Sequence, residues 1–433
     1  MRRVLGLELR RTSLRYSVPL LTLLAAAVAF QAAHPQLATW ANISTSMLRA
    51  ASALAPFIAG LCAWEALRAR RRRMQATDGT AARPAPLIRL PQLLGALIWL
   101  AGSWVVVVAA TAIRGATVGL FGSPEVLPLL QSLLLPLAFA VLGVCTAELL
   151  TSWIAVPAST AFGLALYLLT FAGTGPDALR WADVLSRFAA PDGWTSNPVY
   201  FTGVIVETVG LAALFAALGA LRHRPYRYPS AVAALLAGAL VVAGAGLAIG
   251  QRGRSTTALP EASLTLITVV DSRNRVELRM LEHYRPVAAQ LAEAWGRVSA
   301  LFADTPLAFR RIEQRIDADH ADARPFERLY LNPGATDVAD GSIAEGLQDV
   351  IGCFRDGPAQ GALFSLDGAA VVQSWLRGSR DLPSGFHTPD PQRTLEALRW
   401  LHELPEHDAR AWVTAHLDQI LGCDWEPGDF GRP

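Results

Sequence analysis

The chain has 433 residues, of which 52% are hydrophobic and only 17% are charged. This balance is too apolar for a protein that is soluble throughout its length. All 38 basic residues are arginine, a usage typical of a GC-rich bacterial genome. The absence of lysine excludes the phosphate-binding loop of nucleotide hydrolases, because that loop places a lysine on the terminal phosphates.

The apolar residues are concentrated in the first part of the chain. Residues 1–250 contain 19 arginines and 9 acidic residues, whereas residues 251–433 contain 19 arginines and 27 acidic residues. Charges lie only between or near the ends of apolar runs up to Gly250, and they recur every few residues afterwards. The polar segment 251–257 is typical of a linker. The sequence therefore predicts a polytopic α-helical membrane domain over residues 1–250 and a small α+β soluble domain over residues 251–433.

Seven segments are long and apolar enough to span a bilayer core of roughly 30 Å, which needs about 20 residues of helix. They are Tyr16–Ala33, Arg49–Leu67, Gln92–Ile113, Val126–Leu149, Ile154–Ala172, Phe201–Leu221 and Ala231–Ile249. The second segment is diluted by Pro56, Cys62 and Glu65. The first has an alternative interpretation as a cleaved signal peptide, because a basic region precedes its apolar run and a small-residue site follows at 27–29.

The placement of arginine predicts a cytoplasmic N-terminus, because short cytoplasmic loops retain positive charge. With this orientation, the outer side holds only Arg49, Arg114, Arg180 and Arg187. The predicted location is a bacterial plasma membrane, and an odd number of spans then places residues 251–433 on its extracytoplasmic side. A miscount of one span would move that domain to the inside.

Two acidic residues lie in or close to apolar spans, where an ionisable group is costly and therefore a candidate functional site. Glu207 lies inside the sixth span, and Glu148 lies near the cytoplasmic end of the fourth, from which it can reach water without any function. Glu65 is three residues before Arg68, so an ion pair on the helix surface explains it.

No catalytic or metal motif is recognisable in residues 251–433. The histidines of His402–His407 are five residues apart with Pro405 between them, whereas zinc proteases need histidines four apart on one helix face. No Gly-x-Ser-x-Gly nucleophile motif occurs. The sequence thus indicates no enzyme, no cofactor and no nucleic-acid partner.

Cys353 and Cys423 are the only cysteines of the predicted soluble domain. In an oxidising exterior they can form a disulfide, and the alternative is two buried free thiols. Within this domain, Leu264–Val270 is predicted to be a strand. Apolar residues at intervals of three and four from Met280 to Phe302 predict one helix, with Pro286 in its first turn or at a kink. Further strands are predicted at Phe309–Ile316 and Phe326–Leu331, and helices at Ile343–Phe354, Ala369–Leu376, Pro391–Leu404 and Glu406–Leu421, with Asp390 capping the third of these.

The first 250 residues resemble the permease subunits of the type-2 ABC exporter superfamily, particularly the actinobacterial versions. The resemblance rests on the basic segment 1–11, on the Arg68–Arg73 run with the segment 74–86 after it, and on a polar outer loop between the fifth and sixth spans. It implies that the N-terminal segment lies along the inner membrane face and that Arg68–Pro86 contacts a separate ABC ATPase. The candidate coupling residues are Arg68, Arg70, Arg71, Arg72, Arg73 and Arg83.

The chain departs from that family in two respects, because the family core has six spans and no appended outer domain. Membrane topology and attraction to anionic membrane lipids are an alternative explanation of the arginine run. We expect a permease-like exporter subunit driven by a separate ATPase, and the resemblance implies a homodimer or a heterodimer with another permease subunit. The alternative is a non-transporting membrane anchor that displays the outer domain for binding or sensing. A membrane-tethered hydrolase ranks last for want of a motif.

Overall fold

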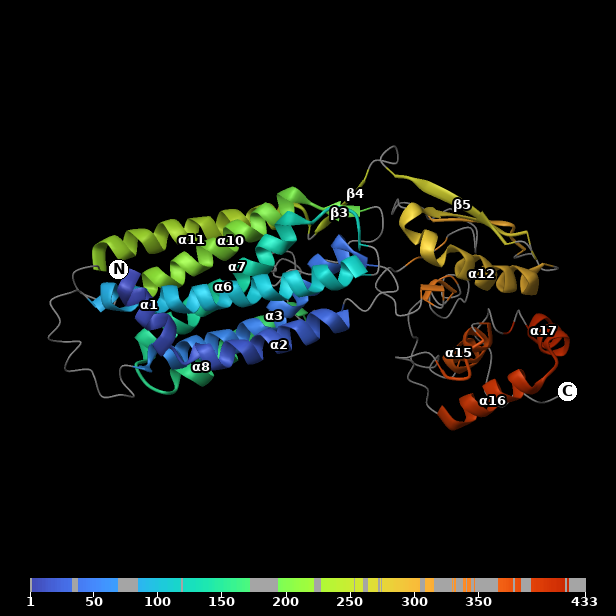
Figure 1. Ribbon diagram of the computed structural model, residues 1–433, viewed down its shortest axis with the longest axis horizontal. Coiled ribbons are helices and arrows are strands. Elements are labelled where there is room, and N and C mark those ends of the chain that lie inside the picture. Colours follow the sequence, from blue (N-terminus) through green and yellow to red (C-terminus); the bar gives the residue numbers. More distant parts are fainter. Residues whose placement is uncertain are drawn as a thin grey trace. The chain divides into compact units, whose positions relative to one another are not determined.

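A computed structural model of the chain describes residues 2–32, 38–68, 85–117, 120–171, 194–221 and 227–252 in the first part. Beyond these it describes residues 254–259, 264–271, 273, 275–303, 308–314, 365–376, 378–382 and 391–416, with isolated positions at 329, 331, 338–339, 341–343, 346 and 419. The chain forms two compact units, of which unit 1 ends at Ala258 and unit 2 continues from Leu259 (Figure 1).

Unit 1 is a bundle of helices, most of them apolar (Figure 1). The helices are α1 (Arg2–Arg11), α2 (Leu14–Ala32), α3 (Trp40–Ala66), α6 (Ala85–Thr117), α7 (Val126–Leu150), α8 (Ala155–Phe171), α10 (Pro198–Ala220) and α11 (Arg227–Gly250). Each of the seven segments predicted to span a membrane is helical over most of its length.

Membrane-length helices are the main feature of this bundle. Among the described residues, 5 helices are long and apolar enough to cross a membrane, namely α3, α6, α7, α10 and α11, and the bent pair α1 and α2 raises the number to 6. Helix α8 is apolar but shorter. Unit 1 is therefore compatible with a helical membrane domain.

Helix α3 begins at Trp40, so the predicted start of the second span at Arg49 is wrong. The Thr39 hydroxyl oxygen caps the helix by accepting a hydrogen bond from the Asn42 backbone N–H at 3.2 Å. Thr45 and Ser46 donate their hydroxyls to carbonyls one turn back, at 2.9 and 2.7 Å. Hydropathy underestimates this part of α3 because its hydroxyl groups are satisfied locally and its side chains are buried inside the bundle.

Small residues let neighbouring helices of unit 1 approach closely, as is usual for helices that pack in a membrane. A Cβ atom on Gly143 of α7 would lie 2.0 Å from the carbonyl oxygen of Ala59 in α3. A Cβ atom on Gly244 of α11 would lie 2.5 Å from the backbone nitrogen of Glu207 in α10. Glycine is thus required at both crossings.

Short strands connect the ends of several helices in unit 1. Strand β1 (Ala38–Thr39) pairs with β2 (Leu120–Phe121) in parallel, and β3 (Trp194–Ser196) pairs with β4 (Thr256–Ala258) in antiparallel orientation. The carboxylate of Glu125 accepts hydrogen bonds from the Thr195 hydroxyl at 2.9 Å and the Ser196 hydroxyl at 2.6 Å. Asn197 then caps α10 by accepting from the backbone N–H groups of the next turn.

Unit 2 contains a three-stranded sheet and several helices. The strands are β5 (Leu266–Val270), β6 (Glu277–Leu281) and β7 (Arg311–Glu313), and β6 pairs antiparallel with β5 and parallel with β7. The helices are η3 (Glu282–Val287), α12 (Ala288–Phe302), α15 (Ser365–Leu376), α16 (Pro391–Glu403) and α17 (Glu406–Ala415). Leu278, Tyr284, Leu291 and Trp295 are fully buried in the core that these elements form.

The prediction of a single helix from Met280 to Phe302 is wrong in its first part. Met280 belongs to β6, Tyr284 lies in the 3-10 helix η3, and α12 begins only at Ala288. The intervals of three and four arise because residues of three successive elements all face the same core. The helices α15 and α16 confirm their predictions, and β7 is shorter than predicted. The predicted strand at 326–331, the predicted helix at 343–354 and Asp390 lie largely or wholly outside the described residues.

Candidate functional site

The N-terminal helix meets the first long apolar helix at a sharp bend. The axes of α1 and α2 differ by 68° across Thr12 and Ser13. The Thr12 hydroxyl accepts a hydrogen bond from the Leu14 backbone N–H at 3.2 Å, which starts α2 in its new direction. Arg10 and Arg11 are exposed in the last turn of α1.

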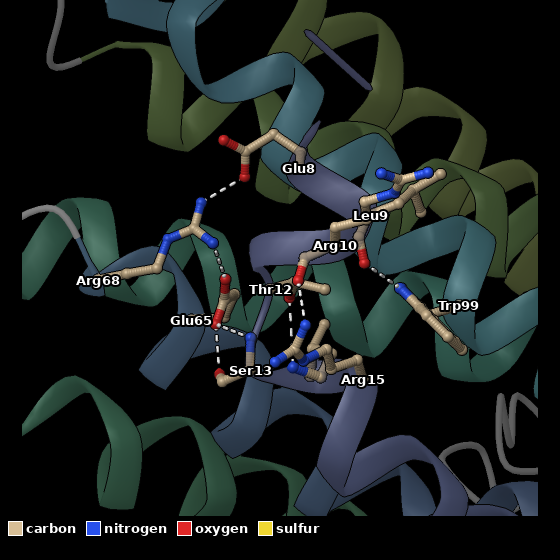
Figure 2. Close-up of polar contacts among 10 residues, drawn as sticks. Glu8, Leu9, Arg10, Thr12, Ser13, Arg15, Glu65, Arg68 and Trp99 are labelled. Carbon is tan, nitrogen blue, oxygen red and sulfur yellow. Dashed lines mark hydrogen bonds and ion pairs between the residues drawn. The ribbon is translucent and has the colours of Figure 1, made fainter. Parts of the chain in front are cut away.

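A cluster of charged side chains holds this bend against the end of α3 (Figure 2). The Arg68 guanidinium contacts the carboxylate of Glu8 in α1, and its Nη1 lies 2.9 Å from Oε1 of Glu65 in α3. The Arg68 and Glu65 side chains are only 8% and 5% exposed, and Glu8 is 20% exposed. The predicted pair of Glu65 with Arg68 is thus present, but it is buried rather than on the helix surface. We name Glu8, Ser13, Glu65 and Arg68 the elbow cluster.

Hydrogen bonds from the bend itself complete the elbow cluster. Ser13 donates its backbone N–H to Oε2 of Glu65 at 3.2 Å, and its hydroxyl donates to the same oxygen. Next to the cluster, the Trp99 indole of α6 donates to the Leu9 carbonyl at 3.2 Å (Figure 2). Two helices that are distant in sequence, α3 and α6, are therefore joined to the bend.

The chemistry of this cluster is suited to linking two helices through one side chain. A guanidinium presents several N–H donors in a planar fork, so one arginine contacts two carboxylates at once. The pair is largely removed from water, where loss of one partner leaves an uncompensated charge. Arg68 is therefore tied to both α1 and α3.

Among the six candidate coupling residues, Arg68 alone lies within the described part of the chain. Arg70, Arg71, Arg72, Arg73 and Arg83 lie outside it. Arg68 directly follows α3 and Leu67, and it is the last described residue before that segment. Arg68 is thus the first residue of the segment Arg68–Pro86, for which the resemblance implies contact with an ATPase.

Glu148 lies in the last turn of α7 and is only 8% exposed, so its carboxylate does not reach solvent freely. The neighbouring Ala147 packs in one apolar cluster with Ala66 and Leu67 of α3. Glu148 therefore lies at the same end of unit 1 as the elbow cluster.

Glu207 lies in the interior of α10 and is also buried. The next residue, Thr208, receives a hydrogen bond from the Gln131 side chain of α7 at 2.9 Å. Glu207 thus adjoins a buried polar contact between two membrane-length helices, away from the last turn of α7 that holds Glu148.

The cysteine and histidine predictions have different outcomes. Cys353 and Cys423 lie outside the described residues, whereas Cys62 and Cys145 are buried free thiols. His402 belongs to α16 and lies 2.8 Å from the Ser379 carbonyl, while His407 belongs to α17. In the described ranges, no three His, Cys, Asp or Glu side chains are grouped to hold a metal ion.

The sequence marked Glu65 and Arg68 but did not reveal Glu8 or Ser13 as their partners. One weak signal in the sequence indicates the bend: Thr12 and Ser13 interrupt a run of strong helix formers. The contact between Arg68 and Glu8 joins residues 60 positions apart, and no local pattern encodes it.

Comparisons of the chain with models of protein families, with curated proteins and with solved structures found no match.

Proposed function

We propose that the chain is a permease-like transmembrane subunit of an ABC exporter, driven by a separate ATPase. In this proposal unit 1 crosses the membrane seven times with its N-terminus in the cytoplasm. Residues 251–433 form an extracytoplasmic soluble α+β domain that handles substrate or partners. The subunit works as a homodimer or with a second permease subunit.

The observation that supports this proposal is the position of Arg68. It directly follows α3 and precedes the arginine-rich segment, and its side chain bridges α3 to the N-terminal helix. A partner that moves residues 69–84 would pull on Arg68 and thereby shift α1 and α3 together. A chain without a nucleotide-binding loop needs such a connection, because the energy must come from another subunit.

Purification in mild detergent from the native host tests the proposal. We expect an ATP-hydrolysing protein to co-purify with the wild-type chain. Reproducible absence of any ATPase from preparations that retain the intact chain would refute it.

A matched pair of variants separates docking from topology. Replacement of Arg70, Arg71, Arg72 and Arg73 by lysine keeps the positive charge that directs topology and attracts anionic lipid. Lysine cannot reproduce the bidentate contacts of arginine with carboxylates, so we expect the lysine variant to recover less ATPase. Glutamine at the same positions removes the charge as well. If the lysine variant recovers the wild-type amount of ATPase, the arginine side chains are not the docking contact.

A non-transporting anchor is the alternative, and the separate hydrophobic core of unit 2 is the observation that favours it. It predicts that no ATPase co-purifies.

In both proposals the C-terminal domain lies outside the cytoplasm. A phosphatase that requires export, fused after Pro433, should be active, and a fluorescent protein at the same place should be dark. The reverse pattern would place the domain in the cytoplasm.

A further inference from the structure

Strand β5 forms one edge of the three-stranded sheet in unit 2 (Figure 1). The Asp271 backbone N–H donates to the Val276 carbonyl, and the Glu282 backbone N–H donates to the Thr265 carbonyl. Hydrogen-bonded positions alternate along an antiparallel strand, so the backbone N–H and C=O groups of Ile267 and Val269 also point toward β6. The backbone N–H and C=O groups of Leu266, Thr268 and Val270 consequently point away from β6. Within the described ranges, no other strand pairs with this side of β5.

The exposed edge lacks the features by which proteins usually protect edge strands. Natural edges carry charged side chains, proline or bulges that prevent pairing with another chain. The segment 264–270 has the sequence LTLITVV, with no charge, no proline and no glycine. Thr268 is exposed and Val270 is 57% exposed, whereas Leu266, Ile267 and Val269 are partly buried against the core. This edge is therefore suited to accept another strand.

We propose that the edge of β5 pairs with β5 of a second copy of this chain, antiparallel and with Thr268 on the two-fold axis. The register follows from the backbone, since the three outward-facing residues are centred on Thr268. Leu266 of one copy then lies opposite Val270 of the other. Each of the three pairs exchanges two hydrogen bonds, about six in total.

The side chains are self-complementary in this register. Thr268 meets Thr268, a cross-strand pair that favours association, and Leu266 meets Val270 on both sides of the axis. Asp271 falls opposite Thr265, so the two Asp271 carboxylates are kept apart. A second copy therefore fits this edge without opposing like charges. The contact does not depend on the transport function proposed above.

Disulfide cross-linking in native membranes tests the register. In the full-length chain with its four cysteines replaced by alanine, Thr268→Cys should form a covalent dimer on oxidation. The Cα atoms of a hydrogen-bonded antiparallel pair are about 5.5 Å apart, within the range that a disulfide spans. Val270→Cys is the matched control on the same strand face. Its two copies would be offset by four residues, about 13 Å along the strand, and should not cross-link.

Hydrogen exchange provides a second measurement that does not depend on contacts elsewhere in the protein. In the wild type, the amides of Leu266 and Val270 should be protected like those of Ile267 and Val269. Thr268→Lys places two like charges on the axis and should remove the protection of the outward-facing amides only. Ala289→Lys, on an exposed position of α12, adds the same charge and should have no effect.

Two results would overturn the inference. Equal cross-linking of Thr268→Cys and Val270→Cys would show random collision or another register. A Thr268→Cys adduct with a different protein, or rapid exchange of the outward-facing amides in the wild type, would show that no second copy covers this edge.

Discussion

Replacement of Arg68 by methionine is the sharpest test of the elbow cluster. Methionine approximates the length and volume of the arginine stem but has no charge and no donor. Glu65 then stays buried, and its carboxylate still accepts a hydrogen bond from Ser13. Glu8 of α1 loses its ion pair with Arg68. The bend between α1 and α2 then loses its link to the end of α3.

The magnitude follows from the burial of the partners. Breaking a buried pair by removal of one member costs about 3–5 kcal/mol, because the other charge is left uncompensated. Glu8 is 20% exposed and can turn toward water, so the lower end of this range applies. For a domain of this size, a loss of about 3 kcal/mol lowers the midpoint of thermal unfolding by roughly 6–12 °C.

Two further variants distinguish charge from packing. Glu8→Gln leaves Arg68 paired with Glu65, so it should cost only about 1 kcal/mol. The double variant Arg68→Met with Glu65→Gln removes both buried charges and should recover most of the stability lost in Arg68→Met alone. Thermal unfolding of the detergent-solubilised full-length chain, followed by size-exclusion chromatography of the soluble fraction, measures all three.

The reasoning would be refuted by either of two results. An unfolding midpoint of Arg68→Met equal to that of the wild type would mean that the cluster does not hold the bend. Failure of the double variant to recover any stability would mean that the shape of the arginine side chain matters rather than its charge.

Four other substitutions, one of them a control, test the helix packing and capping of unit 1 and the core of unit 2. Gly143→Ala should destabilise unit 1, because the new Cβ would lie 2.0 Å from a backbone carbonyl oxygen of α3. Gly102→Ala is the control and should be tolerated, because no atom lies within 4 Å of its new Cβ. The yield of monodisperse protein distinguishes the two variants. Asn197→Ala removes the cap of α10 and should cost about 1 kcal/mol, read as a lower unfolding midpoint, and an unchanged midpoint would contradict the cap. Trp295→Phe leaves the buried Ser342 hydroxyl without its indole donor and should destabilise unit 2 by about 1–3 kcal/mol, with increased proteolysis of that unit as the measurement; wild-type resistance would count against it.

Most helices of unit 1 could be predicted from the sequence, because long apolar runs between charges need no knowledge of neighbours. The beginning of α3 could not, since its polar residues are recognisable as helical only when the bundle that buries them is known. In unit 2, the run from Met280 to Phe302 has helical spacing although it crosses a strand, a 3-10 helix and an α-helix. Spacing alone does not distinguish one helix from three elements that face a common core.

The sequence by itself determined that the chain is built around apolar helices of membrane length, that its basic residues are all arginine, and that Glu65 and Arg68 are one helical turn apart. These properties depend on composition and on local spacing. Only the tertiary structure decided that this ion pair is buried, that Glu8 and Ser13 complete it, and that β5 lies at the edge of its sheet. Such contacts join residues that are far apart in the chain, so they exist only once the helices and strands have packed.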